Sequence, residues 1–274
     1  MNWYKAKTIL IVFLVIINAA LLTYISADSY KSIKNEERVS ETVISLLGDK
    51  GILIDKKLLD SAYKTESLKT VYASNIISDY QSFSELIFSG DVKKINDSEY
   101  TCEKGTVKYS GDSFYVKAAK NSVLAEVKKG SNPEKIAKKY LLTLGIDTSN
   151  TKPIISEDGE KKFLNYERKI GSYKCFGTGI KVEMNSLGII AVSGTWHKYS
   201  KSDVKTELKA ISSVLVDYMN LHTLTKSPVT ITTLSLGYAT LETEVYHEGI
   251  LLIPVWEITD DKGNSKYIDA RENL

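Results

Sequence analysis

Three histidines, His197, His222 and His247, are the side chains of this 274-residue sequence that could act as imidazole bases or metal ligands. His247 precedes Glu248, but the second histidine of the H-E-x-x-H zinc motif is missing. His222 lies near the end of an expected helix, where the helix dipole favours a cation. His197 ends an expected strand directly after Trp196. We therefore predict structural or solvated histidines, with no catalytic residue and no metal site.

Motifs for nucleophilic or nucleotide chemistry are incomplete. Residues 191–194, AVSG, lack the first glycine of the G-x-S-x-G nucleophile turn. Gly177 and Gly179 have no third glycine and open no expected helix, so a dinucleotide-binding loop is not indicated. Glu242 and Glu244 share an expected strand face, which is more typical of a solvated surface than of an acid–base pair. We predict no cofactor. An extracytoplasmic enzyme stays an alternative, and it would need a histidine beside a nucleophile or a carboxylate.

The two cysteines, Cys102 and Cys175, allow at most one disulfide bond. They fall in two different structural units of the expected fold. No feature of the sequence brings their Cα atoms within the roughly 7 Å that a bond requires. We predict two separate packed thiols, and a single bond between them stays open as the alternative.

The charge balance of the chain excludes a polyanion-binding role. The sequence has 36 Lys and Arg against 34 Asp and Glu, with 26% charged and 43% hydrophobic residues. Lys5 and Lys7 are the two basic residues of the first 27, which contain no acidic residue, so the remainder holds 34 of each sign. Nucleic-acid binding needs a clustered basic excess, and we predict no nucleic-acid partner. The same composition is typical of folded rather than disordered chains.

Residues 8–27, TILIVFLVIINAALLTYISA, form an uncharged stretch of 20 residues. At about 1.5 Å per residue, a helix of this length spans roughly 30 Å, the thickness of the hydrocarbon core of a bilayer. Trp3, Lys5 and Lys7 precede it and suit the membrane interface as anchors. A cleaved secretory signal is the alternative. The apolar run is, however, longer than a usual signal core, and residues 27–29, ADS, make a poor cleavage site.

The expected topology is a single-pass protein of the cell membrane. Residues 1–7 form a cytoplasmic tail, residues 8–27 the transmembrane helix, and the remaining chain an extracytoplasmic domain, because long carboxyl-side domains translocate largely regardless of their charge. Inside the span, Asn18 is the polar residue that would seek a hydrogen-bonding partner in lipid. Ala19, Thr23 and Ala27 are four residues apart and share one helix face, where a second helix can approach closely. These four residues are the predicted partner contacts within the membrane.

Repetition organises the expected extracytoplasmic domain. One unit begins with a helix at Asn132-Pro133, which ends before Gly145, and continues with strands at about 163–173, 176–184 and 189–197. The next begins with a helix at Ser202-Asp203, with an apolar stripe running to Met219, and continues with strands at about 230–245, 250–258 and 265–270. The two helix starts lie about 71 residues apart, which is typical of an internal repeat.

A less regular unit, from about 36 to 119, precedes these two. We therefore predict an α+β protein: an N-terminal transmembrane helix followed by repeated units, each a helix packed on an antiparallel sheet. The expected boundaries of the three units are 28–127, 128–200 and 201–274.

Two stretches of the chain resemble the YycI family of Gram-positive bacteria. The opening has Trp3 and then Lys7-Thr8-Ile9 running into the apolar stretch that contains Asn18. The ending has residues 236–238 (LGY), 252–258 (LIPVWEI) and 267–270 (YIDA), and it is also similar to PepSY-like and cystatin-like modules. The likeness covers nearly the whole chain in layout and is sharpest in these two stretches.

The resemblance implies a regulator with no chemistry of its own. YycI-like proteins are single-pass membrane accessories of the WalK–WalR two-component system, which controls cell-wall homeostasis. They are thought to act with a sister protein, YycH, through membrane-helix contacts with the sensor histidine kinase. The expected partners are therefore the transmembrane helices of the kinase, a YycH-like protein and membrane lipid. The alternative function is a membrane-tethered module that binds a peptide or inhibits a protease by adding a strand to a sheet edge.

Overall fold

The computed structural model describes residues 38–63, 68–127, 130–221, 228–240, 245–246 and 249–272. The predicted transmembrane helix and all of its predicted contact and anchor residues lie outside this part of the chain, as do His222, His247, Glu242 and Glu244. Within the described part, no helix has both the length and the apolar character that crossing a membrane requires.

Contacts divide the chain into two compact units, which we call unit 1 and unit 2. Unit 1 takes in the chain up to Thr65, then Ala210–Leu234 and Ile258–Lys266. Unit 2 takes in Glu66–Lys209, Ser235–Glu257 and the chain from Tyr267 onward. The strands β13 (Val229–Ala239), β15 (Gly249–Asp260) and β16 (Ser265–Asp269) contribute residues to both. The three-unit boundaries inferred from the sequence stay a prediction.

Unit 1 packs short helices beside the end of a small sheet. Its helices are residues 38–49, α2 (Lys56–Ala62) and α5 (Ile211–Leu221), and β1 (Ile52–Ile54) pairs in parallel with the start of β13. Asp55 caps α2, because its carboxylate accepts a hydrogen bond of 2.7 Å from the backbone N–H of Lys57. The buried apolar residues of this unit include Leu47, Ile52, Leu59, Val214, Leu215 and Ile231.

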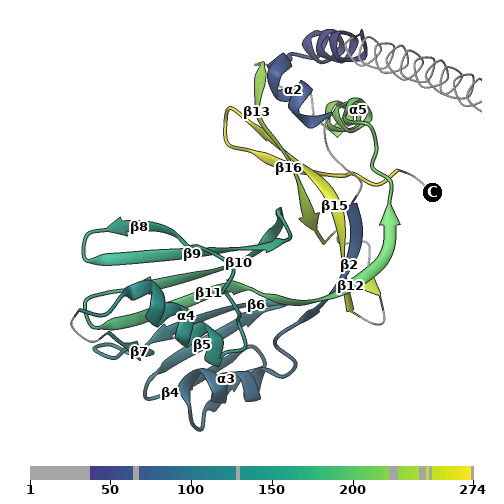
Figure 1. The fold of residues 1–274 in the computed structure, drawn as a ribbon. Helices are drawn as coiled ribbons and strands as arrows, with labels where there is room; N and C mark the ends of the chain where they lie inside the picture. Colours follow the sequence, from purple (N-terminus) through teal and green to yellow (C-terminus); the bar gives the residue numbers. More distant parts are fainter. Residues whose placement is uncertain are drawn as a thin grey trace, which may run out of the picture. The chain divides into compact units, whose positions relative to one another are not determined.

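Unit 2 contains a long antiparallel meander with α3 (Tyr80–Phe88) and α4 (Pro133–Thr143) on one face (Figure 1). The strands that lie wholly in unit 2 are β2 (Leu68–Asn75), β3 (Lys93–Asn96), β4 (Glu99–Cys102), β5 (Gly105–Ser110), β6 (Ser113–Ala118), β7 (Ala125–Glu126), β8 (Ile154–Asp158), β9 (Lys161–Ile170), β10 (Tyr173–Met184), β11 (Gly188–Thr195), β12 (His197–Thr206) and β14 (Val245–Tyr246). The pairing order across the meander is β8-β9-β10-β11-β6-β5-β4-β3.

One face of this meander is apolar and is covered by the two helices. Strand residues alternate between the faces, so that in β6 Phe114 and Val116 are buried whereas Tyr115 and Lys117 are exposed. The buried cluster draws on α3, α4 and six strands; its members include Phe83, Ile87, Leu141, Val107, Phe114, Val116, Leu164, Tyr166, Ile180, Val182, Ile189, Val192 and Trp196. The opposite, open face carries charged pairs such as Lys108–Glu99 at 3.2 Å and Lys161–Glu183 at 2.6 Å.

The predicted opening and end of α4 are confirmed. Asn132 is its N-cap and accepts hydrogen bonds from the backbone N–H groups of Glu134 and Lys135, and Pro133 is the first helical residue. Gly145 follows the helix with a φ of +75°, a conformation that an L-residue with a side chain adopts only under strain. The next helix was misplaced, because residues 197–206 pair with β2 as β12 and α5 begins at Ile211.

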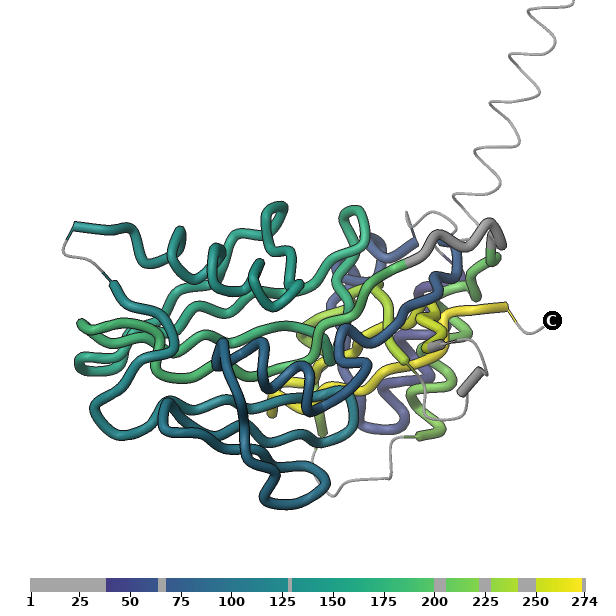
Figure 2. The backbone as a smooth tube through the Cα atoms, turned by 90° about the horizontal axis from the view of Figure 1, so that it is seen from below, coloured from purple at the N-terminus to yellow at the C-terminus, as the bar shows by residue number. Residues whose placement is uncertain are grey.

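The predicted fold class, repeated helix-on-sheet units behind a transmembrane helix, is wrong for the described chain. Its sixteen strands join in one large mixed sheet with five helices, and no membrane-spanning helix is found among the described residues. β6, from the region expected to form a first unit, pairs with β11 from the expected second unit, with Val116 opposite Val192 (Figure 1 and Figure 2). β10 in turn pairs in parallel with β13 through Lys174 opposite Gly237. Such long-range pairing unites segments that local periodicity assigned to separate repeats.

Candidate functional site

Buried and half-buried polar groups gather at one corner of unit 2, where β11 ends and β12 begins. β11 pairs with β10 and β6, whereas β12 pairs with β2, so the chain changes pairing partners at Trp196. Trp196 and the next residue, His197, are 2% and 3% exposed. We call this group the corner cluster; its members are Asn75, Asp112, Arg168, Cys175, Trp196, His197 and Tyr199.

Arg168 lies between two aromatic rings. The Cζ atom of its guanidinium is 4.6 Å from the centroid of the Trp196 ring and 4.5 Å from that of the Tyr199 ring. Arg168 comes from β9 and the two aromatic residues come from either side of the turn into β12. A guanidinium stacks on aromatic faces through its plane and its charge, so the three side chains hold β9 against the corner.

A wide bulge in β10 brings Cys175 into the same corner. Lys174 is opposite Lys169 of β9 and Gly179 is opposite Glu167, so that β10 inserts four residues where β9 has only Arg168. Gly177 has a φ of +70° within the bulge, and the Thr178 hydroxyl donates a hydrogen bond of 2.9 Å to the Cys175 carbonyl. The bulge therefore turns the Cys175 side chain into the interior, where it is fully buried.

His197 has a carboxylate neighbour. Its Nε2 atom lies 3.4 Å from Oδ2 of Asp112, in the turn between β5 and β6. The other oxygen of Asp112 accepts a hydrogen bond of 2.8 Å from Nδ2 of Asn75. Burial lowers the pKa of His197 and the nearby guanidinium of Arg168 lowers it further, whereas the Asp112 carboxylate raises it. The imidazole is consequently held in its neutral form at neutral pH.

The thiol of the corner is also held in its uncharged form. Burial raises the pKa of Cys175 more than its neighbours Tyr199 and Arg168 lower it. Cys102 and Cys175 are both free thiols, as the sequence predicted. A nucleophilic cysteine requires a lowered pKa and access to substrate. The arrangement supports the positioning of the half-buried positive charge of Arg168, rather than nucleophilic attack.

Three buried polar atoms of the corner have no hydrogen-bond partner within the described chain. They are Nδ1 of His197, Nε of Arg168 and the hydroxyl of Tyr199. A buried polar atom without a partner destabilises the fold by about 1–3 kcal/mol. The corner therefore combines strong packing with incomplete hydrogen bonding. Elsewhere in unit 2, single buried polar atoms of Tyr166, Thr148 and Trp256 also lack partners within the described chain, but only the corner gathers several.

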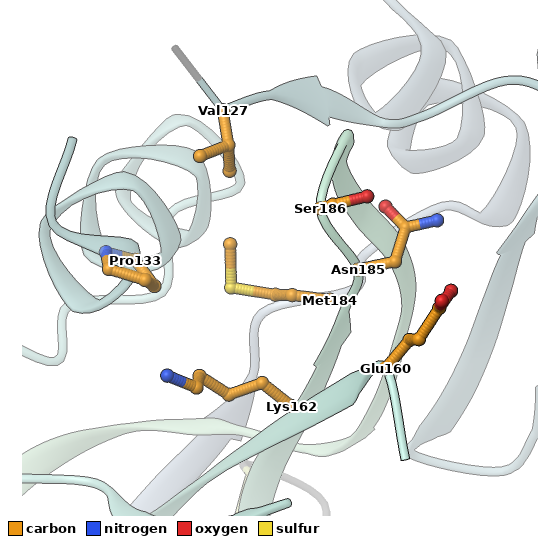
Figure 3. Close-up of a pocket in the computed structure, with 7 residues that line it drawn as sticks. All are labelled: Val127, Pro133, Glu160, Lys162, Met184, Asn185 and Ser186. Atoms are coloured by element: carbon orange, nitrogen blue, oxygen red, sulfur yellow. The ribbon is translucent and has the colours of Figure 1, made fainter. Parts of the chain in front are cut away.

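An open cavity of about 440 Å³ lies at the start of α4. Figure 3 shows Met184 pointing into the space between Val127 and Pro133, with Lys162 beneath it. The amine of Lys162 is already paired with Glu157 at 2.8 Å. The Asn185 side chain accepts hydrogen bonds from the backbone N–H groups that close the next turn. Lys162 and Asn185 of the cavity lining are thus engaged in local structure, whereas Glu160 lines the cavity without an ion-pair partner within the described chain.

Sequence reasoning identified His197 and Cys175 one at a time and missed what surrounds them. Asp112 lies in the β5–β6 turn and Asn75 ends β2, and no local spacing connects them with His197. Arg168 could have been noticed, because it is one of three arginines in a chain whose other basic residues are lysines. The structure brings none of the predicted membrane-contact residues to this corner, because they lie outside the described residues. Within the described chain, no group of three or more potential metal ligands is found.

Comparisons with known proteins add two distant likenesses in structure. No protein-family model matches the sequence, and no curated protein matches it. An uncharacterized protein from Eubacterium rectale is similar, with a TM-score of 0.48 and 12% identity over 77% of this chain and 85% of that one. The YpeB C-terminal domain of Bacillus megaterium is similar with a TM-score of 0.28 and 10% identity, over 88% of this chain and 97% of that domain. Both scores lie below 0.5, so neither likeness indicates a function for this chain, and the YycI resemblance rests on the sequence.

Proposed function

We propose that this chain is a non-enzymatic, membrane-anchored regulator of the YycI type, which modulates a sensor histidine kinase that controls the cell wall. The anchor is the uncharged stretch of residues 8–27, and the kinase contacts are made by its side wall and by the extracytoplasmic domain. A sister protein of the YycH type is a second expected partner. The observation that carries the proposal is this 20-residue apolar stretch with Asn18 beside a row of small residues.

The described part of the chain supports a role without catalysis. Its most reactive candidates, His197 and Cys175, are buried side chains whose pKa shifts favour their uncharged forms. His197 does have the carboxylate neighbour that the enzyme hypothesis requires, at Asp112. However, a general base must reach its substrate, and a side chain that is 3% exposed has little surface to offer one.

A regulator of this kind acts by contacting two states of its partner unequally. A kinase that exchanges between signalling arrangements shifts toward the one that the anchor helix packs against more favourably. Equal binding to both arrangements would change nothing, however tight it was. Hydrogen bonds of an asparagine in lipid contribute about 0.6–2 kcal/mol, which is enough to shift such an equilibrium by roughly 3- to 30-fold.

Site-specific crosslinking in cells tests the proposal. A photoreactive residue at Thr23, on the small-residue face, should trap a sensor kinase or a YycH-like protein, identified by mass spectrometry. The same residue at Leu21 serves as the control, because it points about 200° away around the helix. Equal capture from both positions would contradict a specific contact face. A mature protein that is freely dissolved, trimmed near residue 29 and still fully active would exclude the anchored regulator altogether.

A further inference from the structure

β8 is an edge strand of unit 2 whose residues are all exposed. β8 pairs with β9 on one side, and no other described strand pairs with it. All five of its residues are exposed, and the side chains of Ile154 and Ile155 are 58% and 51% exposed. A strand with one free edge presents unpaired N–H and C=O groups that can bind another strand.

The opposite edge of the same meander is protected in a way that β8 is not. β3 is also exposed on one edge, but Lys93 and Lys94 precede Ile95 there. Lysines on an edge strand discourage pairing with another chain, because adding a strand would bury or crowd their charges. β8 has the sequence IISED, with no lysine and with no proline inside the strand. The difference indicates that the β8 edge is kept available for a partner strand.

The hairpin geometry fixes which backbone groups are free. Gly159 and Glu160 form a two-residue turn, and the φ of +59° at Gly159 is typical of a type II′ turn. Such a turn is closed by a hydrogen-bonded pair, here Asp158 and Lys161. Bonded and non-bonded pairs alternate along the hairpin, so the N–H and C=O groups of Ile155 and Glu157 point away from β9.

We propose that a second copy of this chain pairs along β8, antiparallel and about a two-fold axis at Ser156. In this register Ile155 of each copy faces Glu157 of the other, and their free backbone groups form the new ladder. Ser156 then lies opposite Ser156 of the second copy in a non-bonded position, where two hydroxyls can hydrogen-bond. This inference does not depend on the proposed regulatory function.

Charge complementarity favours a second copy over another occupant. The two-fold register places Lys152 opposite Glu160 of the second copy, twice per dimer. Neither side chain has an ion-pair partner within the described chain, whereas the neighbouring Lys162 and Lys161 are paired with Glu157 and Glu183. Pro153 pushes Lys152 toward an extended backbone, which continues the direction of β8. Lys152 and Glu160, which have no ion-pair partner within one described chain, would therefore pair with each other in the dimer.

Disulfide trapping of the full chain, purified in detergent, tests the register. In a Cys102→Ser background, Ser156→Cys should crosslink to itself under mild oxidation, because the two Cβ atoms would be about 4.5–5.5 Å apart. Ile154→Cys alone should not, since the two copies of residue 154 would be about 14 Å apart along the strands. A mixture of Ile154→Cys and Asp158→Cys should form the mixed dimer. Ile95→Cys on β3 is the matched control for an exposed edge.

Charge reversal then tests the partner. In the Ser156→Cys protein, Lys152→Glu and Glu160→Lys should each slow crosslinking by about two- to tenfold, because each creates two like-charge pairs per dimer. Combining both substitutions should restore the rate. The proposal is overturned if Ser156→Cys crosslinks no faster than Ile95→Cys, if Ile154→Cys crosslinks to itself equally fast, or if the double reversal fails to restore the rate.

Discussion

The interior of unit 2 has two differently built regions, the core beneath α3 and α4 and the corner cluster. The core is largely apolar: the hydroxyls of Ser84 and Tyr109 lie 2.7 Å apart, and the hydroxyl of Tyr166 is a single buried polar atom without a partner within the described chain. The corner packs a guanidinium between two rings and leaves polar atoms of His197, Arg168 and Tyr199 without hydrogen-bond partners.

The two regions should therefore contribute differently to the free energy of unfolding and to its dependence on pH. Apolar burial stabilises a fold whatever the pH, whereas buried titratable groups make its stability depend on conditions. We therefore expect the core to determine whether unit 2 folds, and the corner to determine how its stability varies with pH. The predictions below test this contrast.

Truncation in the core should have the largest effect. Phe114 is 3% exposed and packs edge-on against Phe83, with their ring centroids 5.4 Å apart. Phe114→Ala should lower the free energy of unfolding by about 3–5 kcal/mol, since it leaves a cavity. The adjacent Tyr115 lies on the open face and is 43% exposed, so Tyr115→Ala should cost less than about 1 kcal/mol. Denaturant titration measures both, and similar losses for the two variants would contradict the assigned faces of β6.

Loss of the stacked guanidinium should come next. Arg168→Lys keeps the charge but removes the planar group that lies on both rings, so it should lower the free energy of unfolding by about 1–2 kcal/mol. Lys169→Ala, at the exposed next position of β9, is the matched control and should change little. An unchanged free energy of unfolding for Arg168→Lys would show that the stacking on the two rings does not contribute to stability.

Acid should destabilise the chain through His197. Its pKa is lowered by burial in the folded state, whereas an unfolded histidine titrates near about 6.5. The unfolded state therefore binds more protons below that pH: stability is unaffected above about pH 6.5 and falls below it, by up to about 1.4 kcal/mol per pH unit. His197→Gln should flatten this slope between about pH 6.5 and 5. Parallel pH profiles for both proteins would refute a buried neutral imidazole.

The smallest expected effect is a difference in the rate at which the two cysteines react with a thiol reagent in the folded protein. Cys102 is half-buried and should react with a thiol reagent in the native protein. Cys175 is fully buried and burial raises its pKa, so it should react at least roughly tenfold more slowly until the chain unfolds. Labelling of the Cys102→Ser variant isolates Cys175. Rapid labelling of that variant under native conditions would mean that the corner is open.

Local sequence signals were sufficient for individual elements of this fold. Asn132 and Pro133 marked the start of α4, and Gly145 its end, because capping depends on residues within one turn. The turn of residues 185–188 is equally local, because the Asn185 carboxamide accepts hydrogen bonds from the backbone N–H groups of Leu187 and Gly188.

Long-range pairing could not be predicted in the same way. Val116 and Val192 are cross-strand partners 76 positions apart, and alternation specifies only which face each residue occupies. The helix expected from Ser202 was given too early a start: residues 202–206 belong to β12, which pairs with β2, and the helix begins at Ile211 as α5. The corner escaped prediction for the same reason, since Asp112 lies in the β5–β6 turn, Arg168 in β9 and His197 at the start of β12.

The central claim is that contacts of the membrane helix regulate the kinase. Replacing residues 8–27 with an unrelated apolar helix tests this claim most directly. Output of the partner kinase, read from a reporter gene, should change as it does when the whole protein is deleted, although the exchanged protein is still made and anchored. His197→Gln, by contrast, should leave the output near that of the unmodified protein. Full regulation by the exchanged protein would contradict the account.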